Sequence, residues 1–154
     1  DALLRELNTH ADWLGQTKIR GIDIGGGTPT RLSGRQLERL CRALEPYTQS
    51  TGHAFPVSIE TTPRIASQEP DKLSILSRGG VQRVSMGVQS FNAATLALVN
   101  RRRQVEQTER AMANLRAAGF QRLNLDIIFG LPGQSLSDWL ADLERIIALT
   151  HGCL

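Results

Sequence analysis

The sequence has few cysteines, few aromatic residues and no long apolar run, and each shortage excludes a class of protein. The two cysteines, Cys41 and Cys153, lie far apart and lack the spacing of metal ligands. No apolar stretch approaches the roughly 20 residues that a membrane-spanning helix needs. The first residues lack the layout of a secretory signal peptide. We therefore expect a cytoplasmic protein without a membrane span.

Charge of one sign and stacking residues are also scarce, which argues against nucleic acid as a partner. The formal net charge is +3, and only four Phe and one Tyr could stack on bases. The arginines are spread over several segments instead of forming a stripe. The three histidines, His10, His53 and His151, share no helical spacing. No metal site is predicted from these residues.

What is present is an ordinary globular composition with a regular alternation of elements. The chain has 154 residues and is 40% hydrophobic, which is enough for one domain with a buried core. Apolar periodicity predicts helices over 2–14, 33–46, 70–78, 93–99, 105–118 and from 135 onward. Strands are predicted over 19–24, 57–60, 81–86 and 123–128. This α/β alternation predicts a parallel sheet, either open or forming an arc of a larger (β/α) barrel.

Two of the predicted helices carry signals that the structure can test directly. Ser33 and Gln36 form a capping box before an apolar stripe, and Pro46 is expected to end that helix. The stripe consists of Leu37, Leu40, Cys41 and Leu44, which makes Cys41 a buried thiol. In the last helix the residues predicted to face inward are Leu136, Leu140, Leu143 and Ile147.

The most informative segment runs from Ile22 to Thr30, where a short apolar strand meets three consecutive glycines and Pro29. Glycines without a Cβ let another molecule lie against the main chain and bond to its N–H and C=O groups. Pro29 fixes its own φ and keeps Thr28 extended, which stiffens the turn. The segment suits a polar ligand held by backbone contacts, although an ordinary tight turn would have the same composition.

The other predicted strands also end in polar groups. Ligands of parallel α/β folds sit at the carboxyl ends of the strands, where Glu60, Gln89 and Asp126 are expected. Glu60 could instead be a surface charge, and Gln89 could bond only to loop backbone. Asp126 stands in an apolar run, where an unpaired charge would cost several kcal/mol, so it calls for a cation or a ligand. Arg101 belongs to a basic turn of three arginines, one of which could bind a ligand carboxylate.

These motifs, taken in order, resemble one family. GGGTPT at 25–30, Glu60, GVQSF at 87–91, VNR at 99–101 and LDIIFGLPGQ at 125–134 resemble the radical S-adenosylmethionine (SAM) enzymes of the oxygen-independent coproporphyrinogen III oxidase group. The resemblance covers nearly the whole chain. It implies a partial (β/α)6 barrel of the TIM-like kind, in which residues 1–154 supply the central part of the radical SAM domain.

The resemblance also implies roles for particular residues. Gly26, Gly27 and Thr28 would contact the methionyl part of SAM, and Glu60 would take its ammonium group. A second SAM, present in some members, would be contacted by residues matching the family pattern: Gln89, Arg101 and Asp126. The implied substrate is a porphyrin or haem, and the implied electron donor is a flavodoxin or ferredoxin.

One expected motif is missing. The C-x3-C-x2-C cysteines that hold the 4Fe–4S cluster of this group do not occur here, and such a cluster needs at least three thiolates. The chain has no initiating Met and starts within a predicted helix, so we interpret it as a segment whose cluster-binding part and C-terminal region are absent. We expect this segment alone to bind no cluster and to carry out no radical chemistry.

Three branches of the group remain as hypotheses. They are coproporphyrinogen III decarboxylation, haem ring opening by a haem-utilisation (HutW/ChuW-like) enzyme, and a haem chaperone (HemW-like) that binds without turnover. The residues 99–101 and the pair Pro63-Arg64 resemble the two enzyme branches more than the chaperone. The segment 59–66 resembles the haem-utilisation branch.

Overall fold

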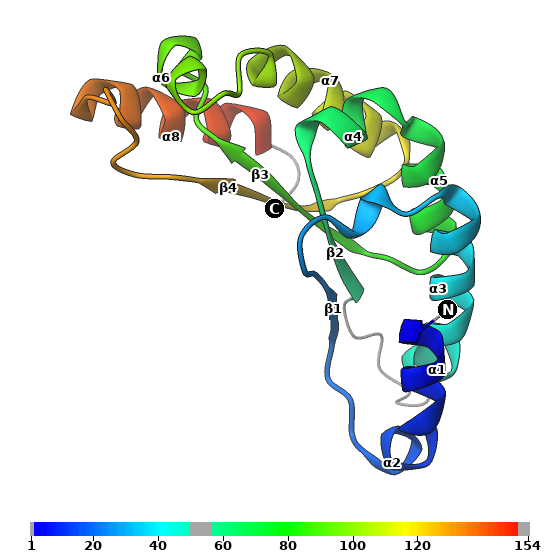
Figure 1. Ribbon diagram of the computed structural model, residues 1–154. Coiled ribbons are helices and arrows are strands. Elements are labelled where there is room, and N and C mark those ends of the chain that lie inside the picture. Colours follow the sequence, from blue (N-terminus) through cyan, green and yellow to red (C-terminus); the bar gives the residue numbers. More distant parts are fainter. Residues whose placement is uncertain (1, 50–56, 151–154) are drawn as a thin grey trace.

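Strands and helices alternate along the chain in the computed structural model, which describes residues 2–49 and 57–150 (Figure 1). Cys153, His53 and His151 lie outside the described residues. The elements in order are α1 (Ala2–Thr9), α2 (Ala11–Gln16), β1 (Ile22–Ile24), the short 3₁₀ turn η1 (Pro29–Arg31), α3 (Gly34–Gln49), β2 (Val57–Thr61), α4 (Pro63–Gln68), α5 (Pro70–Arg78), β3 (Arg83–Gln89), α6 (Ala93–Leu98), α7 (Gln104–Ala117), β4 (Arg122–Ile127) and α8 (Leu136–Thr150).

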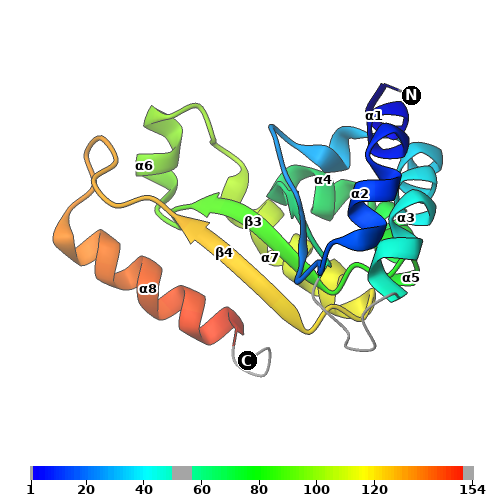
Figure 2. The ribbon, with the colours of Figure 1, turned by 90° about the horizontal axis from the view of Figure 1, so that it is seen from below.

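The four described strands form one parallel sheet in the order β1-β2-β3-β4. The predicted parallel α/β architecture is therefore confirmed. The strands follow the inner side of an arc and most helices lie along its outer side (Figure 1). Helix α8 runs beside β4 at one end of the arc (Figure 2). This curvature is that of part of a (β/α) barrel.

The core lies between the sheet and the outer helices. Ile59 of β2 and Val84 and Met86 of β3 are almost completely buried. They pack with apolar residues of α3, α5 and α7: Leu37, Leu73, Leu76, Met112 and Leu115. Burying one such side chain stabilises the fold by about 1.5–3 kcal/mol. The core therefore holds one face of the sheet firmly, while none of the helices described covers the other face.

Helix α3 begins as the capping box predicts and ends later than predicted. The Ser33 N–H donates to Gln36 Oε1 at 2.8 Å, and the Gln36 N–H donates to Ser33 Oγ at 3.3 Å. The stop at Pro46 was wrong, because the helix continues to Gln49 with Pro46 inside it. Pro46 is exposed and stands in the last turn, so its ring meets solvent and only one helical hydrogen bond is lost.

Three other local predictions differ from the structure. The first predicted helix is two helices divided at His10, and β1 is only three residues long. Helix α4 was not predicted, since six residues are too few to show a period. It begins at Pro63, and the Thr62 hydroxyl caps it by accepting the Ile65 N–H at 3.3 Å.

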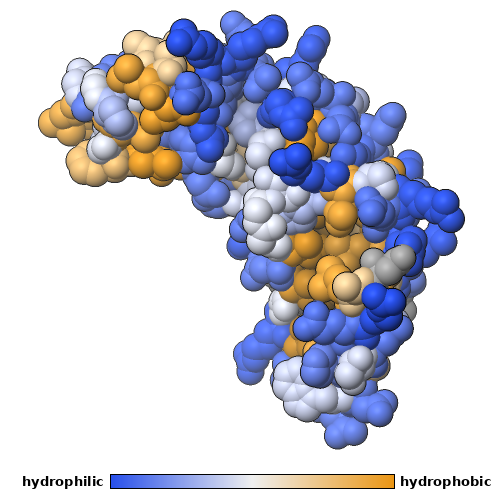
Figure 3. Space-filling view, viewed as in Figure 1, coloured by the Kyte–Doolittle hydropathy of each residue, from blue (hydrophilic) through white to orange (hydrophobic). Residues whose placement is uncertain are grey.

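The apolar residues of α8 do not face inward as predicted. All four are exposed, Leu136 to 68%, Leu140 to 50%, Leu143 to 36% and Ile147 to 60%, which corrects that expectation. The buried residue of α8 is Asp142, whose carboxylate accepts the Phe91 N–H at 2.7 Å. The helix is held to the fold by this contact, by the ion pair of Arg145 with Glu109 and by Leu149, which packs against the core, while apolar surface remains open at this end of the arc (Figure 3). No described helix is long and apolar enough to cross a membrane.

Candidate functional site on the polar face of the sheet

The uncovered face of the sheet is polar, and the strand register determines which residues share it. Glu60 pairs with Ser85, Ser85 with Asn124, and Gly87 with Asp126. Since side chains alternate between the two faces of a sheet, these residues project from the side opposite Ile59, Val84 and Met86. Three neighbouring strands therefore present polar groups to one inner surface.

The glycine turn lies at the carboxyl end of β1 and is open on its outer side. Gly26 and Gly27 have φ values of +90° and +70°, which favour glycine. No other heavy atom stands within 4 Å of the position that a Cβ would take at either residue. Another molecule can approach the main chain there without displacing a side chain.

The segment after the turn is firmly anchored. Thr30 is buried, and its hydroxyl lies 2.9 Å from the Thr61 hydroxyl at the end of β2. The Lys72 ammonium donates to the Thr30 carbonyl at 2.9 Å. The main chain that follows the turn is thus fixed to β2 and α5, so the glycine backbone is held in place before any ligand arrives.

Glu60 stands next to the glycine turn. Its Oε1 atom lies 3.1 Å from the point where a Cβ of Gly25 would be. A side chain at position 25 would displace this carboxylate by a few tenths of an ångström. The side chain of Glu60 is exposed. An exposed carboxylate beside open backbone can receive a cationic group of a ligand.

Asp126 is exposed and hydrogen-bonded, which corrects the expectation of a buried charge in need of a partner. Its carboxylate accepts the Ser85 hydroxyl at 3.0 Å and the Asn124 amide at 2.7 Å. The Asn124 amide also donates to Ser85 Oγ at 3.0 Å. The sequence Leu-Asp-Ile suggested an apolar run, but β4 alternates, with Leu125 and Ile127 on the covered face and Asp126 on the open one.

Gln89 ends β3 in the left-handed region, with φ of +69°. Its amide nitrogen lies 2.6 Å from the position of a Cβ at Gly87, so the side chain folds back over the face that Asp126 shares. A glycine at 87 is needed for this. The register shifts between Gly87 and Gln89, which is the irregularity that turns the end of β3.

Arg101 lies apart from these residues, in the loop between α6 and α7. Its guanidinium donates to Gln104 Oε1 at 3.1 Å, and the Gln104 amide donates to the carbonyls of Gly87, at 3.2 Å, and Val88. Arg101 and Thr28 both line an open cleft of about 480 Å³ at the carboxyl end of the sheet. The structure therefore brings Glu60 to the glycine turn and puts Gln89 and Asp126 on the same face, while Arg101 borders that region through Gln104.

Three polar residues that sequence reasoning missed belong to this region: Ser85, Asn124 and Gln104. Ser85 and Asn124 follow the period-2 pattern of their strands. Ser85 pairs in register with Glu60 on one side and with Asn124 on the other. That alternation was the available signal. Gln104 is a buried polar residue whose role depends on the path of the α6–α7 loop, and no local pattern indicates it.

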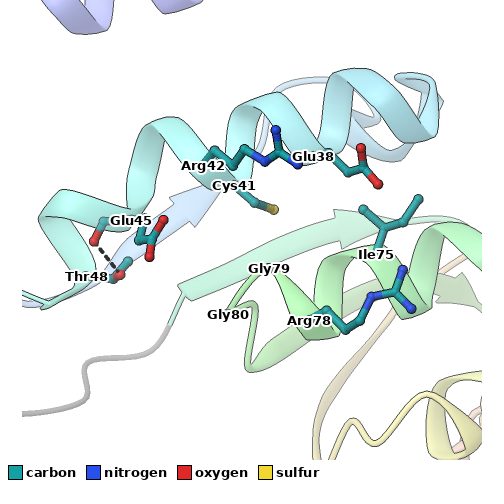
Figure 4. A pocket seen from close by; sticks show the side chains of 9 residues that line it. All are labelled: Glu38, Cys41, Arg42, Glu45, Thr48, Ile75, Arg78, Gly79 and Gly80. Atoms are coloured by element: carbon teal, nitrogen blue, oxygen red, sulfur yellow. Dashed lines mark hydrogen bonds between the residues drawn. The ribbon is translucent and has the colours of Figure 1, made fainter.

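The described residues do not fit an iron–sulfur cluster. Among them, no group of three or more His, Cys, Asp or Glu side chains could hold a metal ion. Cys41 lies between α3 and α5 beside a second hollow of about 400 Å³, among Glu38, Arg42 and Gly79 (Figure 4). Burial raises the pKa of the Cys41 thiol, as expected for a packing residue.

The fold and the motifs together define the class of protein. Residues 3–146 match the family model of the radical SAM superfamily, and the chain belongs to that superfamily. It is 38% identical over 133 residues to the heme chaperone HemW of Lactococcus lactis, covering 86% of this chain and 34% of that protein. It is 36% identical over 149 residues to the oxygen-independent coproporphyrinogen III oxidase of Escherichia coli, covering 97% and 32%.

Solved structures agree with this assignment. The chain resembles the coproporphyrinogen III oxidase of Escherichia coli, described as a radical SAM enzyme, with a TM-score of 0.74 and 32% identity, over 95% of this chain and 36% of that one. The archaeal Elp3 of Methanocaldococcus infernus shares the fold, with a TM-score of 0.69 at 22% identity. The chain spans about a third of the length of these curated relatives.

Proposed function

We propose that this chain is the SAM-binding, central part of a radical SAM protein that acts on a porphyrin or haem. The observation that carries the proposal is the Glu60 carboxylate standing against the open glycine turn. A ligand with an ammonium group beside a polar chain would find a carboxylate and free backbone groups together. SAM is such a ligand, and membership of the superfamily supports it.

The proposed contacts follow from the chemistry of each group. Backbone atoms of Gly26, Gly27 and Thr28 would hold the methionyl part of SAM, and Glu60 would pair with its ammonium. Arg101 suits the carboxylate of a second SAM, and Asp126, with Gln89 near it, suits an ammonium or ribose hydroxyls. Bound SAM supplies either a carbon-centred radical or a methyl group. The residues of this chain orient it and hold it against the inner face of the sheet.

Two enzyme activities on the tetrapyrrole have support. Oxidative decarboxylation of coproporphyrinogen III is supported by the likeness to the Escherichia coli oxidase. Anaerobic ring opening of haem is the other proposed enzyme activity, and it is supported by the resemblance of residues 59–66 to the haem-utilisation branch. The second class of function is a haem carrier, supported by the 38% identity to a heme chaperone.

Two measurements test the proposal. The first is calorimetric titration of the 154-residue chain with SAM, where we expect saturable binding. The second uses the longer protein in which this chain is proposed to lie, reconstituted anaerobically with iron and sulfide and then reduced. Release of 5′-deoxyadenosine supports the enzyme. Stoichiometric haem uptake without SAM cleavage supports the carrier, and absence of SAM binding in both preparations would remove the proposal.

A further inference from the structure

The cleft beside Arg101 is strongly basic. Five arginines line it: Arg31 from η1, Arg64 from α4, and Arg101, Arg102 and Arg103 from the α6–α7 loop. All five are exposed, and no Asp or Glu is among the lining residues. The other lining groups are neutral, with Thr28, Thr62 and Asn100 among the polar ones. Segments that lie far apart in sequence thus bring like charges together around one hollow.

The ion pairs seen in the described part of the chain do not neutralise these charges. Lys72 pairs with Glu69, Arg83 with Asp23 and Arg145 with Glu109, and none of these pairs includes an arginine of the cleft. Arg101 donates to the neutral Gln104 instead. Gathering guanidinium groups without carboxylates is unfavourable because like charges repel. An anion bound in the cleft would attract each guanidinium group and offset this repulsion.

The backbone around the cleft adds to the same potential. Helix α7 begins at Gln104, which lines the cleft together with Gln107. Its N-cap residue, Arg103, makes no side-chain cap hydrogen bond. The positive end of the dipole of this 14-residue helix therefore points toward the arginines without a capping side chain, and the acidic residue of its first turn, Glu106, does not line the cleft. The positive end of the helix dipole and the guanidinium groups both favour a negatively charged ligand.

We infer that this cleft binds the carboxylate side chains of the tetrapyrrole substrate, through Arg31, Arg64, Arg102 and Arg103. The inference rests on the proposed function, which assigns Arg101 to SAM and leaves the other four arginines without a role. A guanidinium group matches a carboxylate with two parallel hydrogen bonds. The cleft adjoins Thr28 of the glycine turn, so side chains held there would keep the macrocycle next to the SAM site.

The test compares porphyrins that differ in carboxylates while keeping the macrocycle. The 154-residue chain is titrated, with fluorescence as readout, with coproporphyrin, with mesoporphyrin, which has fewer carboxylates, and with the methyl ester of coproporphyrin, which has none. We expect affinity to fall in that order and to fall for coproporphyrin as NaCl is raised. Each of Arg64→Gln, Arg102→Gln and Arg103→Gln should weaken coproporphyrin binding roughly twofold to fivefold, a charge-pair effect of exposed groups.

The matched control is Arg110→Gln, an exposed residue of α7 outside the cleft, which should leave coproporphyrin affinity unchanged. SAM titration of the triple variant R64Q/R102Q/R103Q should match the unmodified chain, since these residues do not contact SAM in our assignment. Porphyrin binding that ignores the carboxylates or the three arginines overturns the inference and leaves the proposed function standing. The inference is also overturned if inorganic phosphate displaces bound coproporphyrin at concentrations as low as those at which coproporphyrin itself binds. The cleft would then be a general anion site. Loss of SAM binding by the unmodified chain would instead count against the proposed function.

Discussion

The two faces of the sheet differ more than any other pair of regions in the molecule. On β3, Val84, Met86 and Val88 are almost completely buried against the helices, while Ser85, Gly87 and Gln89 between them face the open side. One face carries the packing that keeps the strands in place, and the other presents groups that can meet a ligand. A step of one residue along a strand therefore changes the expected role of a side chain from stability to binding.

The largest expected effect is on the covered face. Met86→Ala removes a side chain that is 1% exposed and should lower the free energy of unfolding by about 2–5 kcal/mol. Thermal unfolding followed by circular dichroism measures it. Ser85→Ala, one residue away on the open face, is the control and should cost about 1 kcal/mol or less. Equal losses in the two variants would mean that the faces are not distinct.

The next effect is on the open face and concerns binding. Glu60→Gln keeps the shape but removes the charge beside the glycine turn, so SAM binding should weaken at least about tenfold, as for the loss of a charge-assisted hydrogen bond. Calorimetric titration measures the affinity, and the unfolding free energy should stay within about 0.5 kcal/mol. Glu144→Gln, an exposed residue of α8, should change neither quantity. Unchanged SAM affinity in Glu60→Gln would contradict the assignment.

A polar pair on the covered side sharpens the comparison. Thr61 is buried at the end of β2, and its hydroxyl partner is Thr30. Thr61→Val leaves the Thr30 hydroxyl unpaired and should cost about 1–3 kcal/mol, measured by denaturant unfolding. The double variant T30V/T61V, in which both hydroxyls are replaced, should recover most of that loss. A double variant as unstable as the single one would show that packing, not the hydrogen bond, is what the pair contributes.

The smallest effect concerns a carboxylate that serves a helix and not a ligand. Asp138 accepts the N–H of Ser135 at 2.9 Å and its hydroxyl at 2.6 Å, and these bonds lower the Asp138 pKa. Because the folded pKa is lowered, the contribution to stability is present above the ordinary value of 3.8 and is lost as pH falls through the folded value. Asp138→Asn should therefore lower the melting temperature slightly at neutral pH and not at strongly acidic pH, with SAM affinity unchanged. A difference that persists in acid would assign the effect to something other than the charge.

Much of the fold could be predicted because its signals are local. The Ser33–Gln36 box and the polar ends of the strands are each set by a few neighbouring residues. Helix α4 escaped prediction because six residues show no period, and Pro46 misled because its ring clashes only with the preceding turn and leaves the rest of the helix intact.

The site could be predicted only in part, because exposure depends on the whole fold. Asp126 was interpreted as a charge within an apolar run, whereas its neighbours Leu125 and Ile127 point to the other face. The contact between Glu60 and Gly25 requires the register of β1 and β2, which no local pattern specifies. The arginines of the cleft come from three separate segments, and only the fold brings Arg31 and Arg64 to the basic turn at 101–103.

The strand order has a consequence for how the chain assembles. Each strand is hydrogen-bonded to the strand that follows it in sequence, so every sheet pairing closes the loop of one strand–helix–strand unit, in which one or two α-helices separate the strands. The entropy of closing such a loop is modest because it grows slowly with loop length, and no pairing has to wait for the two ends of the chain to meet. The polypeptide can therefore be ordered one unit at a time, each finished strand serving as the template for the next.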